Sequence, residues 1–167
     1  GFELVVRTVL GQQVSVAAAR TFAARLTQRC GTALESPRGS LTHAFPSAEQ
    51  VAAADLSGLG LTSARVTTLR TVAQAVCGGL SLDPTADRDS TRAALLALPG
   101  IGPWTVDYVA MRALGDPDAF PADDLVLRRV LGRSALDVAE AWRPWRAYAA
   151  MHVWAMSADD MTTTKEF

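Results

Sequence analysis

The chain has 167 residues, of which 49% are apolar and 20% are charged. This composition is typical of one folded domain with a sizeable core, and it excludes a disordered or low-complexity chain. The 16 basic and 17 acidic residues give a net charge of −1, which argues against a protein that coats nucleic acid without specificity.

No apolar run approaches the length of a membrane-spanning helix, and no basic-then-apolar signal segment opens the sequence, so we expect no membrane partner. Cys30 and Cys77 match neither a metal-binding nor a redox spacing, which indicates unpaired thiols and a cytoplasmic protein. Fifteen of the 16 basic residues are arginine. An internal lysine nucleophile is therefore excluded, unless Lys165 or the amino terminus serves.

Helical periodicity recurs throughout the chain, whereas alternating strand patterns are scarce. The first predicted helix has an apolar face formed by Phe2, Val5, Val6, Val9 and Leu10. Gly11 ends it, and Ser15 is predicted to cap a second helix. Residues 31–46 contain two prolines and two glycines and are predicted to form a loop. Residues 47–50 read as a capping box that opens a short helix, and a longer helix is predicted over residues 62–76.

Residues 98–105, Leu-Pro-Gly-Ile-Gly-Pro-Trp-Thr, form the most informative motif. Pro99 ends the preceding helix, Gly100 and Gly102 permit unusual backbone angles, and Pro103 suits the first position of the next helix. Backbone N–H groups of such a hairpin can bind one DNA phosphate without reading sequence. The Pro-Gly-x-Gly turn alone fits equally a tight connection between two packed helices.

Beyond the hairpin we predict a helix over residues 103–114, another that begins at Asp123 or Asp124, and two final helices near residues 137–142 and 144–156. The whole chain, residues 1–167, is thus predicted to be one all-α domain, an orthogonal array of eight to ten helices. Five arginines in the last third could contact phosphates or simply form a solvated helix face: Arg128, Arg129, Arg133, Arg143 and Arg146.

The hairpin, followed by Asp124, resembles the helix-hairpin-helix motif of base-excision DNA glycosylases. The resemblance extends through residues 2–15, 59–65, 98–108, 120–129 and 142–148 to the bacterial 3-methyladenine DNA glycosylase II (AlkA) family. It implies a monofunctional glycosylase that hydrolyses the N-glycosidic bond of alkylated purines in duplex DNA after base flipping. Members usually carry a further N-terminal β-rich domain, so we expect this chain to be a fragment of a longer or fused protein. The resemblance also implies a bacterial protein that acts as a monomer.

By this resemblance Asp124 is the essential aspartate, whose carboxylate stabilises positive charge that develops on the sugar. The N-terminus of a helix would favour its charged form. A simpler alternative is that Asp124 is only an N-cap, and both roles are compatible. Asp123 is interpreted as a solvated turn residue.

Trp104 stands where relatives of the endonuclease III type have a lysine, which implies that water is the nucleophile and that the DNA strand is not cut. The chain's two cysteines exclude the four-cysteine iron–sulfur cluster of those relatives. The resemblance places Trp104, Tyr108 and Trp145 in a base pocket, because aromatic faces attract a cationic alkylated purine. The alternative is ordinary core packing, which we also assign to Trp154.

The resemblance further implies a wedge residue at Gln13, for which an exposed turn residue is the alternative. Gly100, Ile101, Gly102 and Thr105 would contact DNA. Family hairpins can also hold a monovalent cation on backbone carbonyls, here those of Leu96, Leu98 and Ile101, and no other cofactor is expected. Two other functions stay open: a catalytically silent DNA-binding module, and a glycosylase for oxidised or deaminated bases.

Overall fold

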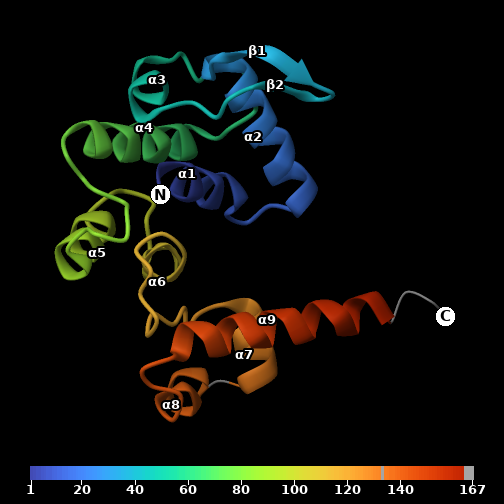
Figure 1. Ribbon diagram of the computed structural model, residues 1–167, viewed down its shortest axis with the longest axis vertical. Helices are drawn as coiled ribbons and strands as arrows, with labels where there is room; N and C mark the ends of the chain where they lie inside the picture. The colour runs from blue at the N-terminus through green and yellow to red at the C-terminus, as the bar shows by residue number, and fades with distance from the viewer. Residues whose placement is uncertain (133, 164–167) are drawn as a thin grey trace. The chain divides into compact units, whose positions relative to one another are not determined.

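The computed structural model describes residues 1–132 and 134–163, and it divides the chain into two compact units, Gly1–Ile101 and Gly102–Phe167 (Figure 1). The first unit contains α1 (Phe2–Gly11), α2 (Val16–Cys30), β1 (Ala33–Arg38), β2 (Leu41–His43), α3 (Ala48–Ala53), α4 (Ser63–Cys77) and α5 (Arg88–Leu96). The second contains α6 (Pro103–Arg112), α7 (Leu125–Leu131), α8 (Ala135–Glu140) and α9 (Arg146–Thr163). The described residues thus form nine helices, which confirms the predicted all-α class.

The helices of the first unit begin at side-chain caps that the sequence predicts. Ser15 Oγ accepts a hydrogen bond of 3.2 Å from the Ala18 N–H and starts α2. Ser47 and Gln50 form the reciprocal capping box at the start of α3. The predicted apolar face of α1 is buried, with four side chains at 0% exposure where α1 packs against α2 and α4: Val5, Val6, Val9 and Leu10.

The predicted loop over residues 31–46 is wrong in part, because β1 and β2 pair there as an antiparallel hairpin after α2 (Figure 1). All six residues of β1 are exposed, so its sequence has no reason to alternate between apolar and polar residues. Backbone pairing carries the hairpin, and Gly39 turns the chain with a φ of 58°. Pro37 is compatible with β1 because a strand in a two-stranded sheet has a free edge.

In the second unit a cluster of ion pairs fixes the start of α9. Arg146 donates to both carboxylate oxygens of Asp118, at 2.7 and 2.9 Å, and also to Glu140 at 3.0 Å. Arg143 adds a contact of 3.1 Å to Asp118. Burial raises the pKa of Asp118, but the hydrogen bonds and charge of Arg146, aided by Arg143, outweigh it and lower that pKa overall.

The final helix begins two residues later than predicted. The final helix is predicted from residue 144 but begins at Arg146, and residues 142–145 form a turn in which the Trp145 N–H donates to the Trp142 carbonyl at 2.7 Å. None of the helices among the described residues combines the length and the apolar character needed to cross a membrane.

Candidate active site

Asp124 is the N-cap of α7, in extended backbone conformation with φ −62° and ψ 132°. Its Oδ1 accepts hydrogen bonds from the backbone N–H groups of Val126 at 2.9 Å and Leu127 at 3.1 Å. The predicted N-cap role is therefore correct. These two bonds also fix the direction in which the carboxylate points, because both come from the rigid first turn of a helix.

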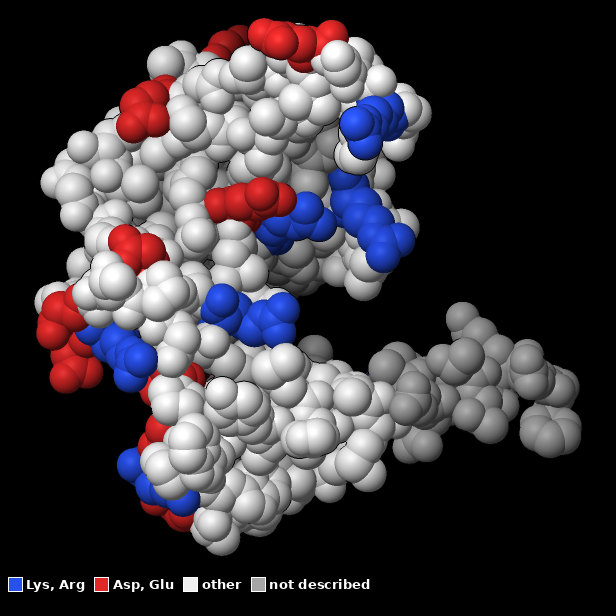
Figure 2. All heavy atoms as spheres, viewed as in Figure 1, with Lys and Arg blue, Asp and Glu red and all other residues white. Residues whose placement is uncertain are grey.

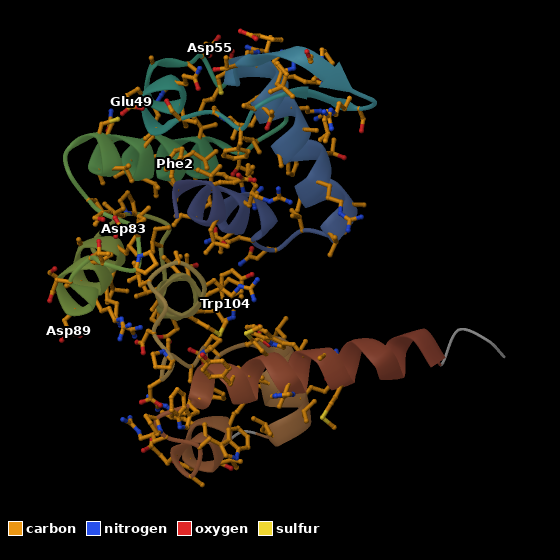
Figure 3. All side chains as sticks on the ribbon, in the orientation of Figure 1. Phe2, Glu49, Asp55, Asp83, Asp89 and Trp104 are labelled. Atoms are coloured by element: carbon orange, nitrogen blue, oxygen red, sulfur yellow. The ribbon has the colours of Figure 1, made fainter. Side chains whose placement is uncertain are left out.

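Two indoles complete the surroundings of this carboxylate. Trp104, in the first turn of α6 (Figure 3), donates its Nε1–H to Asp124 Oδ2 at 3.1 Å. Trp154 of α9 donates its Nε1–H to Asp124 Oδ1 at 2.9 Å. Oδ1 thus accepts three hydrogen bonds, whereas Oδ2 accepts one within the described part of the chain. Since each carboxylate oxygen offers about two lone pairs, Oδ2 keeps acceptor capacity for a cationic or protic ligand.

The same indoles form an aromatic cluster with Tyr108. The rings of Trp104 and Tyr108 are stacked, with centroids 5.3 Å apart and planes 8° from parallel. The rings of Tyr108 and Trp154 are 6.1 Å apart and tilted by 55°. All three side chains are half-buried, so the cluster keeps accessible aromatic surface beside the carboxylate. Such surface attracts flat cationic rings by stacking and by cation–π interaction.

The structure does not bring Trp145 into this cluster. Its side chain is 58% exposed and packs edge-to-face on Tyr148, with ring centroids 5.7 Å apart. Trp154, interpreted from the sequence as core, takes the place beside Asp124 instead. A helical signal for Trp154 exists, because it shares one face of α9 with the buried residues Ala147 and Ala150.

The predicted hairpin connects α5 to α6 along the chain and has the expected local geometry. Gly100 has a φ of 81°, the Ile101 N–H donates to the Leu98 carbonyl at 3.2 Å, and Gly102 is the N-cap of α6 with Pro103 at its first position. The side chains of Ile101 and Thr105 are buried, at 5% and 2% exposure. Neither side chain can therefore reach a phosphate, so any contact from these two residues has to come from the backbone, where the Ile101 N–H also bonds to Leu98.

Backbone carbonyls of the hairpin are also the predicted ligands of a monovalent cation. Leu98 O accepts one hydrogen bond, from Ile101, and a carbonyl oxygen has a second lone pair for a cation. The Leu96 side chain is exposed and leaves this edge of α5 open. No group of three or more His, Cys, Asp or Glu side chains suited to a metal occurs within residues 1–132 and 134–157.

Gln13, the predicted wedge, lies in the turn between α1 and α2. It has a φ of 53°, in the left-handed region that non-glycine residues rarely adopt, and its side chain is exposed. Strained backbone of this kind persists where the surrounding structure enforces it, often at functional positions. The turn thus exposes Gln13 to solvent, which fits both a wedge residue and an ordinary exposed turn residue.

Several arginines of the second unit form ion pairs with carboxylates of the same unit, so they add little to a basic surface. Arg143 and Arg146 pair with Asp118 and Glu140, and Arg128 lies 3.7 Å from Asp123. Arg129 is exposed, whereas Arg133 lies outside the described residues. In Figure 2 several basic side chains lie together on the right of the upper part, whereas acidic side chains lie mostly along its top and left.

Comparison with known proteins agrees with this architecture. The family model described as "HhH-GPD superfamily base excision DNA repair protein" matches residues 6–144. The chain belongs to this family. The HhH-GPD chain is 50% identical over 161 residues to the "Probable bifunctional transcriptional activator/DNA repair enzyme AlkA" of Mycobacterium tuberculosis, covering 91% of this chain and 32% of that protein.

Two further relatives are informative. The HhH-GPD chain is 37% identical to "DNA-3-methyladenine glycosylase 2" of Escherichia coli K12, over 92% of this chain and 56% of the relative. It therefore spans about a third to about half the length of these two relatives. The solved structure of the Schizosaccharomyces pombe 3-methyladenine DNA glycosylase Mag1 in complex with abasic DNA has the same fold, with a TM-score of 0.76 at 23% identity. That match covers 94% of this chain and 80% of the other.

Proposed function

We propose that this HhH-GPD chain is a monofunctional DNA glycosylase that hydrolyses the N-glycosidic bond of alkylated purines, of the 3-methyladenine and 7-methylguanine type, in duplex DNA. The observation that carries the proposal is the Asp124 carboxylate, held by Trp104 and Trp154 beside the stacked ring of Tyr108. The names of the relatives, two of which are 3-methyladenine glycosylases, support the substrate class.

The chemistry follows from the charges. Alkylation at a ring nitrogen gives the purine a positive charge, and the half-buried aromatic faces attract the flipped base by stacking and cation–π contact. When the C1′–N bond breaks, its electron pair leaves with the base and neutralises that charge. Positive charge then develops on the sugar, where the fixed Asp124 carboxylate stabilises it. Because the base is already a good leaving group, no strong general acid is required.

Water completes the reaction in this proposal. It adds to C1′ and loses one proton to solvent, which leaves a free base and an abasic site. Trp104 occupies the position assigned by resemblance to the lysine of strand-cutting relatives, and an indole cannot form a Schiff base. The sole lysine, Lys165, lies outside the described residues. The strand is therefore expected to stay intact.

The hairpin and the Gln13 turn serve DNA binding in this proposal. Backbone N–H groups at Gly100, Ile101, Gly102 and Thr105 bind a phosphate, and Gln13 fills the gap that the flipped base leaves. Carbonyls of Leu96, Leu98 and Ile101 hold a monovalent cation, which would add positive charge next to that phosphate. In this proposal the protein acts as a monomer on duplex DNA in the cytoplasm. The alternative is a DNA-binding module without catalytic activity, and the following experiment distinguishes it from a glycosylase.

The deciding experiment incubates the chain with duplexes that carry a single 7-methylguanine or 3-methyladenine. We expect chromatography to detect the free methylated base, and strand breaks to appear only after heat or alkali. Release of no base would leave the silent DNA-binding module as the function. Breaks without alkali would contradict the monofunctional assignment, and faster release from duplexes with oxidised or deaminated bases would contradict the substrate class.

A second prediction separates Trp154 from Trp145. Trp154→Phe keeps an aromatic ring but removes the donor to Asp124 Oδ1, so we expect the single-turnover excision rate to fall by about 10-fold or more. Trp145→Phe removes only surface packing on Tyr148, and its rate should stay within about twofold of the wild type. The two rates are measured on the same methylated duplex, and the reverse order would restore Trp145 to the base pocket.

A further inference from the structure

Arg65 of α4 is hydrogen-bonded to the end of α1. Its Nη2 donates to the Gln12 carbonyl at 2.6 Å, and its Nε donates to the Val9 carbonyl at 3.2 Å. Carbonyl groups in the last turn of a helix lack helical partners, and a cation there also complements the helix dipole. The Arg65 guanidinium thus fixes the point at which the chain leaves α1.

The Arg65 guanidinium contacts the far side of the turn as well. Its Cζ atom lies 5.9 Å from the centroid of the Phe22 ring, which belongs to α2. The side chain is half-buried between these partners. One residue of α4 therefore holds both helices that flank residues 11–15, the turn that carries Gln13.

Gln12 extends this network to the hairpin. Its side-chain amide donates to the Gly100 carbonyl at 3.1 Å, across 88 positions of sequence. Arg65 thus binds the backbone carbonyl of Gln12, while the Gln12 side chain binds the hairpin. The residue that follows Gln12 is Gln13, which has the positive φ. The turn and the hairpin are thus joined through one residue, whose carbonyl is held by a charged side chain.

We propose that Arg65 is a positioning residue that keeps the Gln13 turn and Gly100 of the phosphate-binding hairpin in one fixed arrangement, so that base flipping at the lesion and phosphate binding occur together. This inference rests on the function proposed above. A rigid link of this kind raises the population of the flipped state, because neither element loses conformational entropy when DNA binds.

The test compares Arg65→Met with the matched control Arg70→Met. Arg70 lies on the same helix and also donates to a backbone carbonyl, that of Ala54 at 3.2 Å, but it does not touch α1. Base flipping is measured from the fluorescence of 2-aminopurine placed beside the lesion, and excision from the single-turnover rate at saturating enzyme. Both are recorded below the melting temperature of each variant.

For Arg65→Met we expect a weaker flipping signal and an excision rate lower by about 10- to 100-fold, as for other small displacements of a binding element. Arg65→Lys should recover part of both, because an ammonium group can still donate to the carbonyls of Val9 and Gln12. Arg70→Met should match the wild type. Gln12→Ala, which cuts only the link to Gly100, should weaken affinity for a duplex with an abasic-site analogue.

The outcomes are distinguishable from those of the proposed function. A wild type that releases no methylated base contradicts the glycosylase proposal, whereas the inference is judged by the differences among variants. Equal flipping signals for Arg65→Met and Arg70→Met overturn the positioning role. If Arg65→Met does not fold, wild-type flipping by Gln12→Ala together with its unchanged affinity for the abasic duplex overturns it.

Discussion

Asp124→Asn is expected to lower the excision rate by at least about 100-fold while duplex binding persists. The substitution removes the negative charge that faces the sugar, and its carbonyl oxygen can keep the bonds from Val126, Leu127 and Trp154. Its amide NH2 group then faces the Nε1–H of Trp104, so one donor loses its acceptor. We expect a loss of about 1 to 3 kcal/mol in unfolding free energy for that lost bond.

The matched control is Asp123→Asn. Asp123 is exposed, and the nearest basic group, on Arg128, is 3.7 Å away, so the control also removes a charge at the start of α7 without touching the indoles. The single-turnover rates of both variants and their affinities for a methylated duplex are measured together. If Asp124→Asn releases base as fast as Asp123→Asn, the Asp124 carboxylate has no part in the chemistry.

Gly100→Ala is the substitution for which we expect the largest loss of stability, at least about 2 kcal/mol. A Cβ at this position would overlap the Oγ1 atom of Thr68, which is held in place by its hydrogen bond of 3.1 Å to Ala64. The φ of 81° adds strain that any L side chain would meet. Chemical denaturation followed by circular dichroism measures the change in unfolding free energy.

Gly102→Ala is the control for this prediction. A Cβ at Gly102 has no neighbour within 4 Å, and the φ of −103° is accessible to alanine, so we expect a loss below about 1 kcal/mol. The double variant Gly100→Ala/Thr68→Ala should recover part of the loss, because the overlapping Oγ1 is gone while the backbone strain stays. Equal stability of the two glycine variants would contradict both the overlap with Thr68 and the backbone strain at residue 100.

Much of the fold follows from local sequence signals. Caps at Ser15, Ser47 and Asp124 are short-range hydrogen bonds between residues two or three apart. They are predictable because the donor and the acceptor lie within the same short stretch of sequence. The hairpin geometry at Gly100 and Pro103 was predictable for the same reason. The pairing of β1 with β2 was not, because exposed strands bury no apolar face that could leave a periodic signal.

The candidate site was predictable only in part. Trp104 and Tyr108 are one helical turn apart, so their stacking follows from sequence spacing. Trp154 reaches Asp124 across 30 residues, and that contact depends on how α9 packs against α7. No local rule distinguishes Trp154 from Trp145 at that range. The link from Gln12 to Gly100 is of the same long-range kind.

In the proposed glycosylase, the double use of Trp104 limits how the range of excised lesions can change. Its ring stacks on Tyr108 while its Nε1–H holds Asp124, so phenylalanine or tyrosine there would keep the stacking surface and lose the hold on the carboxylate. Tyr108 touches both indoles through its ring alone. In that enzyme, variation at residue 108 would reshape the surface offered to a damaged base without removing either indole hydrogen bond to Asp124.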